Sequence, residues 1–269
     1  MLCALTPYCA VSQTVEVRIE QADEIARNPA VVDGQRLIGD VRLSVDGAVV
    51  HCDSAWRYTD GRFQMMGEVR VEDGPMALFG RQLTLHPDSG VGTMTGPQVR
   101  LVDSSEADGA RTLVTTQTIY DFREGVARYA GGGEVRTQGE LITSEQGRYQ
   151  RDSGRMDFMG EVDMEVDTLR VSAERVGYLP KSRRLLLTVP TEIRYPSGGV
   201  DCARGEWDLE AGGGWFAGDS VSLARFRDGD LVVTGDSLAL TDSLGVARGR
   251  VLLTDTVGTY RLGGNAVDF

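Results

Sequence analysis

Apolar and polar residues alternate along most of the chain. Val41, Leu43 and Val45 are separated by single polar residues, and the same alternation runs through residues 162–166 and 169–173. Successive side chains of a β-strand point to opposite faces, so a period of two gives each strand one buried and one solvated face. Because the pattern continues over about 200 residues, we predict an all-β protein.

The alternating runs belong to an internal repeat. A turn residue, usually Gly, precedes a β-branched residue that opens each unit, and seven spacings of 27 to 36 residues have a mean of 30. The residues that open the eight units are Val41, Val69, Val99, Val135, Val162, Ile193, Val221 and Val251. Asp-Gly pairs end several runs, and this dipeptide is a strong hairpin signal. The opening Gly lies inside alternate strands and predicts a bulge or bend there. Two strands in each of about eight units predict fifteen or sixteen strands.

No unit of this size can bury its apolar face by itself, so we expect the units to stack into an elongated object. We assign residues 36–269 to this repeat domain and residues 13–35 to an irregular N-terminal segment. Within that segment, residues 20–30 are compatible with a short helix or an added edge strand. The last unit stops partway, which predicts that a partner covers the exposed strand edge or that the natural protein continues.

Residues 1–12 resemble a truncated signal peptide, because a short apolar run is followed by Ala10-Val11-Ser12 with the small residues of a cleavage site. This reading predicts export to the periplasm. A lipid-modified Cys9 and a terminus without function remain alternatives. The run is too short to span a bilayer.

Net charge and cysteine content exclude several classes of function. The formal charge of −12 argues against nucleic acid or an anionic membrane as a partner, and a solvated acidic surface is the simplest interpretation. Cys52 and Cys202 lie five units apart, too far for a disulfide, so we predict two buried free thiols. The sequence contains no metal-binding Cys or His spacing, and we expect neither a metal nor a cofactor.

We find no arrangement of residues typical of an enzyme. His51 and His86 lie in different units and are read as structural or surface residues. The aspartates that follow the runs are read as turn residues, which bond to nearby backbone. They are Asp46, Asp60, Asp73, Asp88, Asp103 and Asp152. A polysaccharide lyase on a β-helix is disfavoured because Lys181 is the only lysine. We predict that the chain is not an enzyme.

Several segments resemble the OstA-like family, which includes the periplasmic bridge protein of lipopolysaccharide transport. They include VVHCDSAWRY at residues 49–58 and a motif made by Leu141, Thr143, Gly147, Tyr149, Gly154, Phe158, Gly160 and Val162. The resemblance covers about residues 36–255. It implies an elongated β-jellyroll of two facing antiparallel sheets that carries acyl chains between the sheets. It also implies lipopolysaccharide or lipid A as ligand, and end-to-end stacking with other OstA-like domains or with a second copy, as a bridge toward the outer membrane.

The same resemblance suggests which side chains would line the lipid groove. The candidates are Val41, Leu43, Trp56, Phe63, Met65, Val69, Leu83, Met94, Phe158, Val162 and Met164. Further aromatic candidates for the wall are Phe79, Trp207, Trp215 and Phe216, and Met66, Met156 and Met159 add adaptable side chains. Arg57, Arg81 and Arg184 are candidates for lipid phosphates by residue type only. The alternative function is a structural spacer or adhesin module with a closed interior and no lipid ligand.

Overall fold

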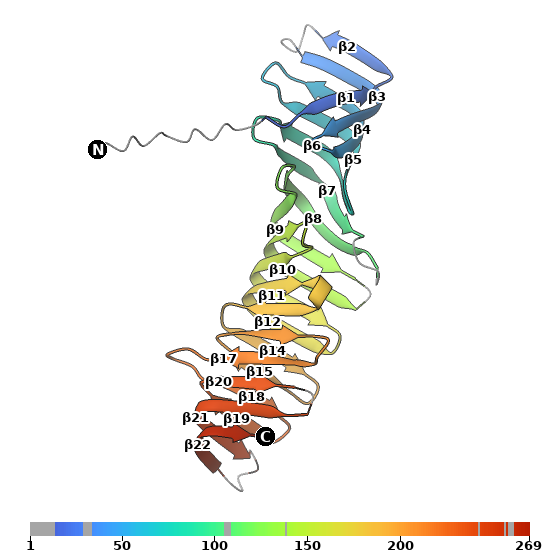
Figure 1. Cartoon of the computed structure of the whole chain (residues 1–269). Helices are drawn as coiled ribbons and strands as arrows, with labels where there is room; N and C mark the ends of the chain where they lie inside the picture. The colour runs from blue at the N-terminus through green and yellow to red at the C-terminus, as the bar shows by residue number, and fades with distance from the viewer. Residues whose placement is uncertain are drawn as a thin grey trace, which may run out of the picture.

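The computed structural model describes residues 14–28, 34–104, 109–137, 139–241, 243–255, 257 and 261–269. The predicted leader lies outside this part of the chain. The described residues form 22 strands and one short 3₁₀ helix, Pro180–Ser182. Figure 1 shows them as one elongated, twisted stack. The expected all-β class and stacked architecture are confirmed.

Ten long strands follow one another as an antiparallel meander. They are β3 (Gly34–Val45), β4 (Ala48–Arg57), β5 (Phe63–Asp73), β6 (Met76–His86), β7 (Val91–Asp103), β8 (Arg111–Asp121), β9 (Val126–Arg136), β10 (Glu140–Gln150), β11 (Met156–Val166) and β12 (Leu169–Leu179). At the N-terminal end, β1 (Val17–Gln21) and β2 (Glu24–Asn28) both pair with β3. The interpretation of residues 20–30 as an added edge strand is therefore the correct one as far as they are described.

The C-terminal part consists of shorter strands. They are β13 (Arg184–Leu187), β14 (Thr191–Tyr195), β15 (Gly198–Cys202), β16 (Arg204–Asp208), β17 (Gly213–Ala217), β18 (Ala224–Asp228), β19 (Leu231–Gly235), β20 (Ser237–Leu240), β21 (Gly245–Asp255) and β22 (Arg261–Asp268). The prediction of fifteen or sixteen strands was wrong for this part, because most units here divide at the bend into two short strands. Val221 also does not open a strand, since it is 90% exposed in the loop before β18.

The strands build two facing layers. Each long strand bends near its middle, so one half lies in layer A, with Leu37 and Ala55, and the other half lies in layer B, with Val41 and Val50. In the C-terminal part, β13, β16, β17 and β20 continue layer A, and β14, β15, β18 and β19 continue layer B. β21 rejoins the two layers. The bends form one long edge of the molecule, and the turns of both layers meet at the opposite edge, which we call the mouth.

Bulges at the unit-opening glycines produce the bends. In β3, Gly39 and Asp40 stand opposite the single residue Asp53 of β4, and both have positive φ angles, 74° and 38°. The same register shift occurs at Gly67 and at Gly160, with φ angles of 107° and 75°. A bulge with two residues against one increases the local twist and turns the strand. The predicted bulges are confirmed, and they explain why a Gly precedes the β-branched residue in most units.

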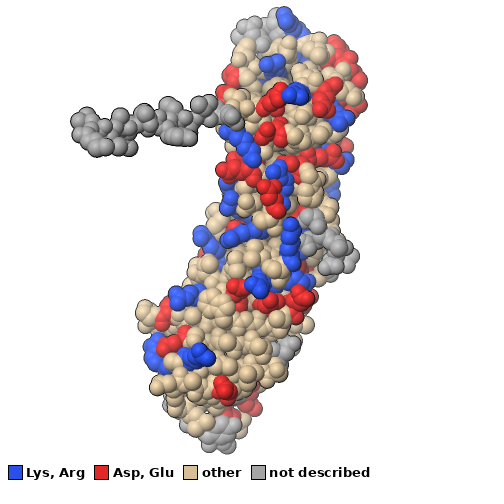
Figure 2. All heavy atoms as spheres, in the orientation of Figure 1, with Lys and Arg blue, Asp and Glu red and all other residues tan. Residues whose placement is uncertain are grey.

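Charged residues on the outer faces pair across neighbouring strands. Arg42 contacts Glu20 at 3.0 Å, and Arg184 contacts Glu206 at 2.9 Å. Figure 2 shows acidic and basic side chains intermixed over the N-terminal and central parts of the face in view. The net negative charge is thus spread over a solvated surface, where single ion pairs contribute little to stability.

Cys52 and Cys202 are buried free thiols, as predicted. Burial is the main cause that raises the pKa of each thiol to about 12. Both side chains therefore stay protonated at neutral pH and serve as small apolar residues of the interior.

Substitution of a bulge glycine tests this account of the bends. We expect Gly67→Ala to reduce the free energy of unfolding by about 1–3 kcal/mol, because an L-residue is strained at this positive φ and its Cβ would meet the Asp53 carboxylate. Gly264→Ala in β22 is the control, since the nearest atom to an added Cβ lies at 3.8 Å. Urea unfolding followed by circular dichroism measures both, and equal losses would contradict the account.

Candidate functional site

At its N-terminal end the mouth is closed by the segment that precedes β1. The Val15 amide donates to the Pro87 carbonyl of layer A at 2.8 Å. The next residue, Glu16, accepts a hydrogen bond from the Asp46 amide of layer B at 3.2 Å. Val15 itself is only 4% exposed. The segment therefore ties the two layers together across the mouth.

In the middle of the molecule the mouth is closed by three tyrosines of layer A, each facing an acidic residue of layer B. The Tyr120 hydroxyl donates to Asp73, and the Tyr178 hydroxyl donates to Glu140. Between them, Tyr149 interacts with Asp103. We call these three pairs the ladder, and each pair a rung. Its tyrosines lie at intervals of 29 residues, on β8, β10 and β12.

Two arginines extend the ladder. Arg151 forms an ion pair with Asp73 of the first rung, and the Arg111 guanidinium lies 3.6 Å from the Glu140 carboxylate of the third rung. Arg111 and Glu140 are 8% and 7% exposed. Charged groups as buried as these are retained only when they are paired, and removing one partner typically costs about 3–5 kcal/mol. Arg111 and Glu140 both lie in layer B, so the layers are connected by the hydrogen bonds of Tyr120 and Tyr178 and by the Arg151–Asp73 ion pair.

Burial in the ladder raises the pKa of its three phenols. Desolvation is the largest cause for Tyr120, Tyr149 and Tyr178, and the facing carboxylates add to it. The hydroxyls therefore stay protonated at physiological pH, and those of Tyr120 and Tyr178 remain donors to Asp73 and Glu140.

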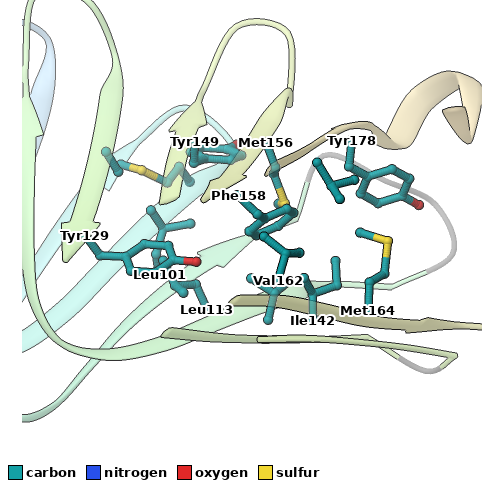
Figure 3. Close-up of a cluster of buried hydrophobic side chains, with 14 of the residues drawn as sticks. Leu101, Leu113, Tyr129, Ile142, Tyr149, Met156, Phe158, Val162, Met164 and Tyr178 are labelled. Carbon is teal, nitrogen blue, oxygen red and sulfur yellow. The ribbon is translucent and has the colours of Figure 1, made fainter. Parts of the chain in front are cut away.

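Closely packed apolar side chains fill the interior below the ladder. Figure 3 shows Phe158 between Met156, Val162 and Ile142. Phe158 and Val162 are both 2% exposed. A cavity beside Phe158 and Arg111 measures only about 10 Å³. This volume is about that of a single water site, so the space cannot hold an alkyl chain.

C-terminal to the ladder the layers separate and leave an open cleft of about 540 Å³. Residues of both layers line it: Asp167, Thr168, Leu169, Tyr195, Pro196, Trp207, Leu209, Gly212, Phe226, Asp228, Leu231, Leu240, Thr241, Ser243, Leu244, Gly245 and Phe269. The volume lies within the range of about 300–1,000 Å³ that is typical of small-molecule sites, and the lining is mainly apolar and aromatic, as such sites usually are.

The residues at the mouth explain why the cleft is open. In layer A, each strand has one residue directly opposite its equivalent on the next strand. Starting from Tyr178, these residues are Leu185, Trp207, Gly214, Leu240 and Gly245. In layer B, the corresponding residues that follow Glu140 include Val166, Leu169, Gly198, Asp228 and Leu231. The phenols of layer A are thus replaced by apolar and small residues, and the acidic residues of layer B are replaced by apolar residues and Gly except at Asp228. The layers meet here through aromatic contact instead, as Tyr195 and Trp207 show with ring centroids 6.3 Å apart.

Two acidic residues belong to the cleft lining, Asp167 and Asp228. The Asp167 carboxylate accepts a hydrogen bond from the Arg183 guanidinium at 2.6 Å. At the far end, Phe269 packs against Phe226, with ring centroids 5.2 Å apart, and its backbone exchanges two hydrogen bonds with Gly245. An aromatic pair thus delimits the cleft on that side.

Ten of the eleven lipid candidates point into the interior. Val41, Leu43, Phe63, Met65, Val69, Leu83, Met94, Phe158, Val162 and Met164 are at most 4% exposed. Trp56 is the exception, because it lies half-buried beside Ala55 on the outer face, with the Arg36 guanidinium 5.2 Å from its ring. All eleven lie outside the open cleft.

The additional candidates divide between the two faces. Trp207 and Phe216 are interior residues, and Trp207 lines the cleft. Phe79 stacks with Arg70 and Arg100 on the outer face, and Trp215 is 48% exposed. Arg184 binds Glu206 at 2.9 Å and is absent from the cleft lining.

Sequence reasoning missed the ladder. It assigned Asp73 and Asp103 to turns, whereas both carboxylates face tyrosines across the mouth. The equal spacing of Tyr120, Tyr149 and Tyr178 could have revealed it, because residues one repeat apart occupy the same place in successive units.

Among the described residues, no group of three or more His, Cys, Asp and Glu side chains could hold a metal ion. In the same part of the chain, no helix is long and apolar enough to cross a bilayer. The site is an open cleft in a two-layered β-jellyroll, with a mainly apolar wall and polar groups at the rim.

The chain belongs to the OstA-like family, whose model matches residues 14–174. No curated protein matches the chain. Among solved structures, the chain is similar to LptH of Pseudomonas aeruginosa, the LptA-homologous periplasmic component of the lipopolysaccharide transport device. The identity is 14%, the match covers 56% of this chain and 95% of that one, and the TM-score is 0.38.

The raised pKa values of the ladder phenols predict a loss of stability in alkali. The unfolded tyrosines ionise near pH 10, whereas the folded ones ionise at higher pH. Their contribution is therefore fully present below about pH 10 and is lost as the pH rises toward the folded values. We expect the free energy of unfolding to fall between pH 10 and 11.5, and to fall less steeply in Tyr178→Phe. Urea titrations at each pH measure it, and identical slopes would contradict the assignment.

Proposed function

We propose that this chain is a periplasmic lipid-binding protein of lipopolysaccharide transport, which shields acyl chains in the cleft between β12 and β22. The observation that carries the proposal is an open, apolar and aromatic cleft of about 540 Å³ in a chain of the OstA-like family. Removing an alkyl chain from water is favourable by about 0.8 kcal/mol for each buried methylene, so a cleft of this kind can hold a lipid firmly.

The polar groups at the cleft favour a ligand whose head stays at the rim. Thr168, Thr241 and Ser243 lie at the turns, where hydroxyl groups of a sugar can reach them. Arg183 binds Asp167 at the inner end and is a candidate to contact a phosphate at the rim. A glycolipid with acyl chains inside and sugars outside therefore matches this distribution.

The closed part of the stack supports a different role for residues 34–166. Its interior is filled by its own side chains, which is what the spacer alternative predicts for a module without a ligand. We infer that this part is a rigid stem that holds the cleft at a distance from the other end of the molecule.

The two ends of the stack offer edges for partners. β1 and β2 form one end and β22 forms the other, and Ile19, Ile25 and Leu262 are 37%, 59% and 56% exposed there. An exposed strand edge is a template for another strand. We propose that these edges pair with other OstA-like domains of the transport machinery, or with a second copy of the chain.

A charge placed in the cleft tests lipid binding. Leu231→Glu puts a carboxylate on the cleft wall, and we expect it to weaken binding of lipopolysaccharide by about tenfold or more, because the charge would lose its hydration against an acyl chain. Native mass spectrometry and competition with a fluorescent fatty acid measure the affinity.

Ala239→Glu is the matched control, since Ala239 is exposed on the outer side of layer A and lies outside the cleft lining. Phe63 and Phe158 are unsuitable positions for such a test, because they are core residues whose replacement by a charge would unfold the protein. Absence of a complex with the unmodified protein at saturating lipid would exclude the proposed function. Equal affinities of the two variants would exclude this cleft as the site.

A further inference from the structure

Polar groups close an interior that is otherwise apolar, and they do so directly beside the cleft. Strand pairing sets Tyr178 next to Leu185 in layer A, and Glu140 next to Val166 in layer B. Leu185 and Val166 are both fully buried. They separate the inner end of the cleft, marked by Leu169, from the third rung of the ladder. The rung holds the two layers together at the place where the cleft ends.

An apolar seam would be a weak barrier to an alkyl chain. When such a seam opens around the chain, contacts between side chains are replaced by contacts with methylene groups, and little free energy is lost. A phenol–carboxylate seam behaves differently. Opening it with an alkyl chain would break the hydrogen bond from the Tyr178 hydroxyl to the Glu140 carboxylate and would separate the Tyr178 ring from the Arg111 guanidinium, which lies 5.7 Å away. Glu140 is only 7% exposed, so water does not replace the lost bond, and a buried polar group that loses its hydrogen bond is unfavourable.

We propose that the third rung, Tyr178 with Glu140, sets the length of alkyl chain that the cleft accepts. This inference rests on the proposed function, because it assumes that an alkyl chain enters the cleft. From β12 to β21, layer B advances by five strand spacings of about 4.8 Å, and the cleft lining runs from Leu169 to Gly245, so the cleft extends over about 24 Å along the stack. A chain that lies along it with its methyl end toward Leu169 meets Val166 and Leu185, and the rung prevents these two residues from separating.

The rung closes the cleft at the end that faces the ladder. An alkyl chain then enters and leaves through the mouth or past the Phe226–Phe269 pair, and it does not slide on through the stack. The ligand class that follows is an amphiphile with a chain of limited length and a head group at the rim.

A series of n-alkyl glycosides tests the proposal, because they differ only in chain length and their uncharged heads avoid the charges of the rim. Affinities are measured below the micellar concentration by competition with a fluorescent alkyl probe. For the unmodified protein we expect binding to tighten by about fourfold for each added methylene, and then to reach a plateau. The length at which the plateau begins is the quantity of interest.

Tyr178→Phe removes the bond to Glu140 and keeps the ring, so we expect the plateau to begin at a longer chain. Tyr120→Phe is the matched control, because it removes the same kind of bond, to Asp73, two rungs from the cleft. Its plateau should equal that of the unmodified protein. Leu169→Trp fills the inner end and should move the plateau to a shorter chain, which tests the orientation of the ligand without altering the ladder.

The outcomes separate this proposal from the proposed function. If no glycoside or lipopolysaccharide binds, the proposed function fails. If glycosides bind but affinity rises without a plateau, or if Tyr178→Phe and Tyr120→Phe leave the plateau equally unchanged, the rung does not set chain length. If Leu169→Trp leaves the plateau where it was, the alkyl chain does not point toward the ladder, and the proposal is overturned.

Discussion

The two-layered architecture depends on a change of direction in the middle of each long strand. A strand that ran straight would belong to one layer only, and the stack would have an apolar face open to water. The bulges at Gly39, Gly67 and Gly160 turn the chain and keep the inward residues of both halves facing each other. Hydrogen bonding continues across the bends between consecutive strands, so ten long strands form both layers without a separate connection.

The C-terminal part solves the same problem differently, and this matters for the site. From residue 184 the chain mostly divides at the bend into two short strands, with β13 followed by β14 and β17 followed by β18. From β13 to β20 the two layers then share no strand, so the residues at the mouth mainly determine whether the layers contact each other or separate. Where those residues are phenols and carboxylates the mouth is closed, and where they are Gly, Leu and aromatic residues it is open.

Much of the fold could be predicted from sequence, because a period of two and a repeat of about 30 residues each have a direct structural meaning. The alternation of apolar and polar residues is enough to predict that Val41, Leu43 and Val45 point into the interior. Trp56 was misplaced because large aromatic side chains were assigned to the groove by type, whereas alternation with Ala55 puts it on the outer face beside Arg36. Val221 was misplaced because a Gly-Asp before a β-branched residue occurs in loops as well as in bulges.

The location of the open site could not be read from the pattern of apolar residues, because closed and open parts share the same alternation. The difference lies in pairs of residues that are distant in sequence, such as Tyr120 with Asp73 at a separation of 47 residues. An acidic residue after a strand is compatible with a turn and with a cross-layer bond. The choice between a turn and a cross-layer bond depends on which residue of the other layer faces the carboxylate. That residue is known only when the relative shift of the two layers along the stack is known.

The ladder also shows what polar groups can do in a stack whose interior is otherwise apolar. Replacing a buried ion pair by apolar residues of the same volume is often neutral or stabilising, so stability does not require Arg111 and Glu140. A ligand that is itself apolar can enter any apolar seam, however, and a stack lined throughout by Leu and Val would have no defined binding position. Three polar rungs in succession make the central seam unfavourable for an alkyl chain while leaving the C-terminal seam favourable. Under the proposed function, the position of the ligand along the stack would be determined by where the tyrosines end.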